Sequence, residues 1–130
     1  IELMPMGICA GWGKCRFLPA KAVLERVPEL EPAGASGVSL LYRLPGARGT
    51  VGLIEPMSHA FCSQCSRIRI TADGRLKPCL HSAAEISLRG LSGEALLEAL
   101  RAGIAAKPER HELERDGVTQ TGRSMNEIGG

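Results

Sequence analysis

Three cysteines within one short segment constrain this chain more than any other feature. Cys62 and Cys65 form a CxxC step, and Cys79 follows after thirteen further residues, in the run FCSQCSRIRITADGRLKPCL. A thiolate is a soft, anionic ligand, and a two-residue spacer lets a chain wrap around one ion or one corner of a cluster. The segment therefore predicts a metal centre held by these three residues.

The stretch between the cysteines predicts a β-hairpin. Polar and apolar residues alternate over 67–71, and Asp73-Gly74 is a strong turn signal. Residues 75–80 can then run back as the partner strand. If the loop has three residues and ends at a left-handed Gly74, Thr71 pairs with Arg75. Counting back along both strands then sets Cys79 opposite Arg67. A two-residue loop would shift the pairing by one and turn Cys79 to the other face.

Arg67 and Arg69 lie two apart on the first strand of this hairpin. Alternate residues of a strand share a face and lie about 7 Å apart, and guanidinium groups bind phosphate oxygens in pairs. The surrounding segment 62–81 also carries Arg75 and Lys77 against Asp73 alone, a balance that suits an anionic small molecule. The alternative for such a pair is an ordinary solvated strand face.

Ligand types alone leave the metal open. Zinc with His81 or His59 as a fourth ligand, an iron–sulfur cluster, and a disulfide or free thiols all agree with the cysteine spacing. His81 follows Cys79 by two residues, and the commoner placement for such a residue, a partly exposed strand end, is expected here. The remaining cysteines, Cys9 and Cys15, lie in a Gly-rich loop and are interpreted as incidental thiols.

Four runs, IELMPMG, FCSQCSRIRITADGRLKPCL, AAKPERH and SMNEIGG, follow one another along nearly the whole chain. In this order they resemble a late barrel strand, the second-cluster segment, a late helix end and the double-glycine terminus of the molybdenum cofactor biosynthesis protein A family, the GTP 3′,8-cyclases of the radical SAM superfamily. The cysteine run is the most specific of the four. The resemblance implies an α+β fold, a small antiparallel sheet with flanking helices that forms the C-terminal part of a partial TIM-like barrel enzyme.

The same resemblance implies roles for individual residues. It implies a [4Fe-4S] cluster with an open fourth iron that meets the guanine of GTP, held by Cys62, Cys65 and Cys79. It implies a GTP-contacting stretch formed by Arg67, Ile68 and Arg69. Met4 matches a position that contacts S-adenosylmethionine, and the terminal Gly129-Gly130 matches a tail that enters the active site. His81 departs from the family, which has an apolar aromatic residue there.

The parent enzyme implied by the resemblance is a lyase that converts GTP to (8S)-3′,8-cyclo-7,8-dihydroguanosine 5′-triphosphate. Its radical chemistry needs S-adenosylmethionine on a second [4Fe-4S] cluster held by a CxxxCxxC motif, which is absent from these residues. The chain is therefore expected to be inactive alone and to need a missing N-terminal barrel. A homodimeric parent is compatible with this expectation. Two alternatives stay open: a stand-alone zinc module of the Cys3His type, and the auxiliary-cluster domain of another radical SAM enzyme.

The rest of the chain predicts a modest α+β domain. A net charge of +2 and 3% aromatic residues argue against a nucleic-acid partner, and the absence of a signal sequence or long apolar run argues for a reducing, cytoplasmic location without a membrane contact. Expected elements, in order, are a strand at 1–4, a helix at 19–27, a hairpin at 38–44 and 50–54 in one sheet with the cysteine hairpin, and a helix at 92–107 with an apolar face formed by Leu96, Leu97, Leu100 and Ile104. The expected division is 1–18 as a last barrel strand and loop, 19–108 as the iron–sulfur domain, and 109–130 as a mobile polar tail.

Overall fold

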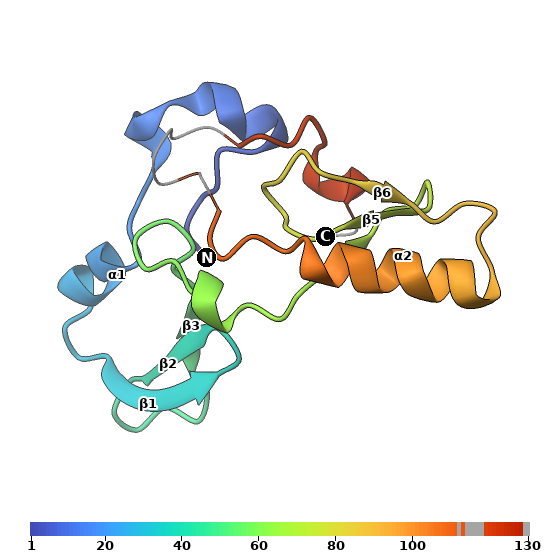
Figure 1. Cartoon of the computed structure of the whole chain (residues 1–130). Helices are drawn as coiled ribbons and strands as arrows, with labels where there is room; N and C mark the ends of the chain where they lie inside the picture. Colours follow the sequence, from blue (N-terminus) through green and yellow to red (C-terminus); the bar gives the residue numbers. More distant parts are fainter. Residues whose placement is uncertain (112, 114–118, 129–130) are drawn as a thin grey trace. The chain divides into compact units, whose positions relative to one another are not determined.

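A computed structural model describes residues 1–111, 113 and 119–128, and the α+β class is confirmed (Figure 1). The chain divides into two compact units, Ile1–Met4 with Gly13–Phe61 and Pro5–Trp12 with Cys62–Gly130. Within the described part of the chain, no helix is both long and apolar enough to cross a membrane. Each unit is described separately below.

The first unit is built on a three-stranded antiparallel sheet. Its elements are α1 (Lys21–Arg26), β1 (Glu31–Ser36), β2 (Ser39–Arg43) and β3 (Val51–Leu53), and the strand order is β1-β2-β3 (Figure 1). The predicted helix and the predicted hairpin of β2 with β3 are both confirmed. Strand β1 was not predicted, because Pro32 and Gly34 are rare inside strands. The sheet accommodates them with a bulge between these two residues.

The N-terminal strand predicted from the sequence is not formed, although the Glu2 N–H donates to Ile54 O at 3.0 Å. The segment is held instead by the buried Glu2 carboxylate, which accepts hydrogen bonds from the N–H groups of Ala20, Met57 and Ser58 and from the Ser58 hydroxyl. Burial opposes ionisation, but these hydrogen bonds outweigh it and lower the pKa of Glu2. Hydrogen bonds to the charged Glu2 side chain thus fix this segment in place of the expected strand ladder.

The second unit has its own three-stranded antiparallel sheet and the longest helix. Its elements are β4 (Arg69–Ile70), β5 (Arg75–Lys77), β6 (Ile86–Ser87) and α2 (Gly93–Ala105), and the strand order is β4-β5-β6 (Figure 1). The prediction of one sheet shared by both hairpins is wrong. The open edges of β2 and β5 are taken by β1 and β6, which no hydrophobic alternation announces.

Helix α2 packs on β5 and β6 through Gly103 rather than through a stripe of leucines. Gly103 is buried against Leu76, whose side chain is 0% exposed. The predicted apolar face is therefore only partly correct. Leu96 and Leu100 are half-buried, whereas Leu97 and Ile104 are exposed. The helix is rotated so that Gly103 meets the sheet, which allows a close approach of the two backbones.

The described part of the C-terminal tail is folded rather than extended. Leu113, Thr121 and Ile128 are buried, although the tail was expected to be mobile for lack of apolar anchors. Residues Met125–Glu127 form a short 3-10 helix that opens with a capping box between Ser124 and Glu127. The predicted functional residues Gly129 and Gly130 lie outside the described residues.

Candidate metal and substrate site

The cysteine hairpin forms with the predicted loop and register. Arg69 lies opposite Lys77 and Ile70 opposite Leu76, and the Thr71 N–H donates to Arg75 O at 2.9 Å. Gly74 has a left-handed φ of 75°, and its N–H donates to Thr71 O at 2.9 Å. The loop therefore has three residues, and the two-residue alternative is wrong. The predicted position of Cys79 opposite Arg67 lies beyond the last paired residues and stays a prediction.

The strand ladder stops before the cysteines, and beyond it the two strands are joined by hydrogen bonds from a lysine side chain. Paired strand residues end at Arg69 and Lys77, so the predicted strands at 67–71 and 75–80 are shorter than expected. Beyond them, the Lys107 ammonium donates to three acceptors on both strand ends, Arg67 O at 2.8 Å, Pro78 O at 3.2 Å and Cys65 Sγ at 3.6 Å. Sequence reasoning missed this role and took Lys107 only as the end of a helix.

The three cysteines are half-buried free thiols of the second unit. Cys62 opens a 3-10 turn at Cys62–Gln64, and the Cys65 N–H closes it by donating to Cys62 O at 3.0 Å. Across the described residues, no three His, Cys, Asp or Glu side chains are placed close enough to hold one metal ion. The donor set fits an iron–sulfur or zinc centre by its chemistry, whereas the side chains as placed do not enclose one.

His81 is buried, so the expectation of a partly exposed strand end is wrong. Its residue is 6% exposed, its Nδ1 lies 3.4 Å from Thr119 Oγ1, and its ring meets His111 edge-on with centroids 5.0 Å apart. Burial and the neighbouring His111 lower the pKa of His81 to about 4, so the imidazole is neutral at physiological pH. By contrast, His59 lies in the first unit with an 87% exposed side chain.

A cavity of about 140 Å³ opens beside these histidines in the second unit. It is lined by Cys79, His81, Ser82, Pro108, Arg110, His111 and Gln120. His111 lines this cavity, and its Nδ1 is buried with no hydrogen-bond partner among the residues that the structure describes. The cavity therefore combines one predicted metal ligand with two imidazoles.

The predicted substrate residues occupy the strand that leads from Cys65. Arg69 and Ile68 are half-buried and Arg67 is exposed, with Arg69 on β4 and the other two just before it. Met4 is half-buried and belongs to the first unit. The structure thus brings the arginines and the cysteines into one unit, and their assignment to substrate stays a prediction.

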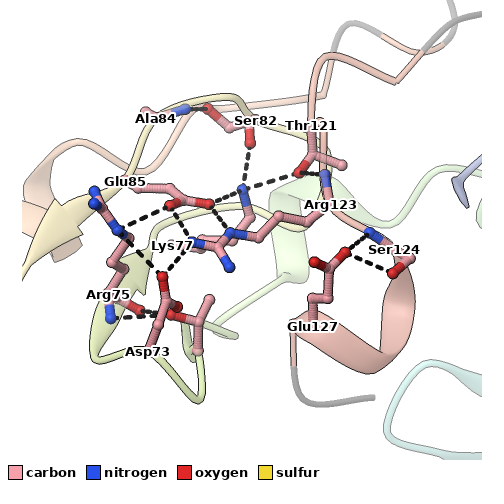
Figure 2. A network of polar contacts seen from close by, with 11 residues as sticks. Asp73, Arg75, Lys77, Ser82, Ala84, Glu85, Thr121, Arg123, Ser124 and Glu127 are labelled. Atoms are coloured by element: carbon pink, nitrogen blue, oxygen red, sulfur yellow. Dashed lines mark hydrogen bonds and ion pairs between the residues drawn. The ribbon is translucent and has the colours of Figure 1, made fainter.

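Two of the basic residues counted toward an anion-binding surface are already paired. Arg75 and Lys77 contact Glu85, and Arg75 also contacts Asp73 at 3.4 Å. Arg123 from the tail binds the same two carboxylates (Figure 2). We refer to this network as the Arg123 cluster, and it consists of Asp73, Arg75, Lys77, Glu85, Thr121 and Arg123. It was not predicted, because its members are far apart in the sequence.

These features combine a β-hairpin and a CxxC turn within one small α+β unit. The sequence model of one family, described as Molybdenum Cofactor Synthesis C, matches residues 1–113. The chain therefore belongs to the Molybdenum Cofactor Synthesis C family.

Curated relatives similar to the chain are GTP 3′,8-cyclases. Those of Alkaliphilus metalliredigens, Alkaliphilus oremlandii and Moorella thermoacetica are 47%, 43% and 42% identical, and each match covers 100% of this chain. It covers 42%, 42% and 43% of the respective relative, within its C-terminal portion. The chain thus spans less than half the length of the curated relatives it matches. No solved structure matches it.

Proposed function

We propose that this chain is the substrate-binding and auxiliary-cluster region of a GTP 3′,8-cyclase of molybdenum cofactor biosynthesis. The observation that carries the proposal is the cysteine hairpin, which forms in the predicted register and whose ends at Arg67 and Pro78 are bridged by Lys107 beside Cys65. The 47% identity to a GTP 3′,8-cyclase supports the same reading. The activity belongs to a longer cytoplasmic enzyme, a radical SAM lyase with an N-terminal barrel, and this region alone is inactive.

In this proposal the thiolates of Cys62, Cys65 and Cys79 would hold a [4Fe-4S] cluster and would leave its fourth iron open for substrate. When bound, the cluster supplies a Lewis-acidic iron for the guanine of GTP. Lys107 keeps the two strand ends together, because its ammonium bridges Arg67 O and Pro78 O and donates to a ligand sulfur. Hydrogen bonds to cluster sulfurs also tune the reduction potential.

The remaining assignments follow the strand and the family resemblance. Arg67 and Arg69 bind the triphosphate, and Ile68 between them contacts the nucleotide. Met4 contacts S-adenosylmethionine, which a second [4Fe-4S] cluster of the N-terminal part binds. The Gly129-Gly130 terminus enters the active site, where residues without side chains fit a narrow channel. Holding GTP in one pose directs a radical to one hydrogen, which is the contribution expected of a positioning region.

The test is the metal content of protein reconstituted without oxygen, followed by addition of GTP. The proposal expects about four irons and four sulfides per chain, a brown colour, and an EPR or visible spectrum that GTP changes. Colourless protein with one tightly bound zinc and no response to GTP would contradict it.

A zinc-stabilised module is the second candidate, and His81 is the observation that favours it. A buried, neutral imidazole two residues after Cys79 is the chemical form that ligates zinc. This candidate predicts that chelators unfold the protein and that iron does not replace the zinc. The metal analysis above distinguishes the two candidates.

Substituting the strand arginines is expected to weaken GTP binding without loss of iron. Each of Arg67→Gln and Arg69→Gln removes charge-assisted hydrogen bonds worth about 1.5–3 kcal/mol, which corresponds to a Kd raised about tenfold or more. Calorimetry on the reconstituted protein measures this change. Arg101→Gln is the matched control, because Arg101 is exposed on α2 and pairs with Glu94. Loss of iron in either strand variant would argue against a pure substrate role.

Lys107→Met is expected to destabilise the cysteine end of the hairpin. The substitution keeps the aliphatic stem but removes the donor for three acceptors, at a loss of about 1–3 kcal/mol. Urea unfolding measures the difference. In the control Lys21→Met, the side chain is 80% exposed and pairs with Glu25 on one turn of α1, so little change is expected. Equal stability of the two variants would show that the bridge has no structural role.

A further inference from the structure

The Arg123 cluster joins the C-terminal segment to the hairpin that carries Cys79 (Figure 2). Arg123 donates to both oxygens of Glu85, from Nε at 2.6 Å and from Nη2 at 2.9 Å, and Nη2 also donates to Asp73 Oδ2 at 2.8 Å. A fork that grips one carboxylate with two nitrogens has a fixed orientation. These hydrogen bonds lower the pKa of Asp73 and of Glu85 and raise the pKa of Arg123.

Lys77 is the fully buried member of the same cluster. Its side chain is 0% exposed, and its ammonium donates to Ser82 O at 2.7 Å, Thr121 Oγ1 at 3.2 Å and Glu85 Oε1 at 3.4 Å. The three acceptors match the three protons of an ammonium group. Without Thr121, one proton of a fully buried cation would lack an acceptor, and such a group is costly to leave unpaired. The tail residue therefore completes the burial of Lys77.

Immediately after the cluster, the chain turns tightly and packs again. The Ser124 N–H and hydroxyl both donate to Glu127 Oε2, at 2.8 Å and 2.6 Å. Gly7, in a left-handed conformation, lies against Ser124, so that a Cβ at this position would be 3.2 Å from Ser124 Cβ. Ile128 is 1% exposed. Residues 121–128 are thus held at both ends.

We propose that the Arg123 cluster anchors the C-terminal segment 121–128 on the cysteine hairpin, with Arg123, Thr121 and Lys77 as its positioning residues. The anchoring stands on the contacts above. The contacts join residues 38, 44 and 50 positions apart, from Glu85 to Arg123, from Lys77 to Thr121 and from Asp73 to Arg123. Such separations link the tail to the hairpin and not to its own neighbours.

The test compares backbone order parameters of the full chain by ¹⁵N relaxation. In the unaltered protein, residues 121–128 are expected to be as rigid as α2, with order parameters of about 0.85. Thr121→Val keeps the shape and removes the hydroxyl, and Arg123→Gln removes the fork. Both are expected to lower the tail values below about 0.6 while those of α2 and β5 stay unchanged. Thr121→Ser keeps the hydroxyl and should restore order.

Matched controls separate anchoring from general effects. Arg101→Gln makes the same change of charge on the exposed face of α2 and should leave the tail rigid. Tail values unchanged in both Thr121→Val and Arg123→Gln would overturn the proposal, and so would equal effects of serine and valine at position 121. Loss of order throughout the second unit in Thr121→Val would assign the cluster to the core instead. Iron content measured on the same samples tests the proposed function separately.

The anchoring is expected to fail in acid. The pKa values of Asp73 and Glu85 are lowered in the folded state, so their contribution is complete above the ordinary carboxylate pKa and is lost as pH falls through the folded value. The other charged groups facing them are Arg75 and Lys77 on β5 and Arg123 and Glu127 in the tail. Tail order should therefore be constant from about pH 7 to pH 5 and decrease below about pH 4. In Arg123→Gln this transition should be absent.

Discussion

Cys79→Ser is expected to reduce the iron of anaerobically reconstituted protein from about four atoms per chain to nearly none, as loss of one of three protein ligands predicts. The hairpin register explains why one distant cysteine matters as much as the CxxC pair. The ladder from Thr71 to Lys77 directs the second strand back toward Cys65, and Lys107 joins both strand ends. A hydroxyl on this framework keeps the shape and loses the soft anionic donor. Iron and sulfide analysis with the visible spectrum measures the effect.

Cys15→Ser is the matched control for this experiment. Cys15 lies exposed in the 3-10 segment Lys14–Arg16 of the first unit, outside the cysteine hairpin. Its replacement should leave iron, sulfide and colour unchanged. If Cys79→Ser retains a full complement of iron, Cys79 is no ligand and the proposed cluster site is wrong. If zinc rather than iron falls in Cys79→Ser, the structural zinc module is the correct reading.

Gly103→Ala is expected to destabilise the second unit by about 2 kcal/mol, although alanine favours a helix over glycine by about 1 kcal/mol. The reason is that the packed interface has no room for an added methyl group. A Cβ at position 103 would overlap Leu76 Cδ2 and lie 2.9 Å from Leu76 Cγ and 3.5 Å from Ile86 Cδ1. Because Leu76 is fully buried, it has little room to move, and overpacking of this kind costs about 1–3 kcal/mol or more. Urea unfolding of the two proteins gives the difference.

A double-mutant cycle with Leu76→Ala isolates this contact. Leu76→Ala alone should cost about 2–5 kcal/mol, because it leaves a cavity in the core. In that background the clash is removed, so Gly103→Ala should be neutral or stabilising. A sign change of this kind identifies the contact between α2 and β5 as the cause. If Gly103→Ala is stabilising in the unaltered protein as well, helix propensity dominates and the close packing of α2 is not needed.

The parts of the fold that local chemistry determines were predictable. The turn at Asp73-Gly74 fixes its own register, since left-handed Gly74 selects the three-residue loop. Pro19 and Pro28 lie just outside the two ends of α1, and the Pro-Gly turn region between 38–44 and 50–54 identified the hairpin of β2 and β3. These signals lie within a few residues of the structure they specify. Strands β1 and β6 carry no such signal, and with them the division into two sheets was missed.

The candidate site was predictable as a set of residue types and only partly as an arrangement. Cysteine spacing identifies ligands, whereas burial of His81 depends on Thr119 and His111, which are about thirty or more positions further along the chain. The bridge from Lys107 and the anchor at Arg123 depend on tertiary contacts in the same way. A charge count over a short segment treats Arg75 and Lys77 as available, because their shared partner Glu85 lies outside that segment.

The bulge in β1 has a consequence for how copies of this protein behave together. An open strand edge recruits strands from other molecules, which leads to aggregation. On the outer edge of the first sheet, Pro32 lacks an N–H and Gly34, with a φ of 110°, departs from extended geometry. At the opposite edge, β3 has three residues. Neither edge of the sheet therefore offers the long regular row of donors and acceptors that an incoming strand would need. This lowers the tendency of the protein to aggregate at the concentrations that spectroscopy requires.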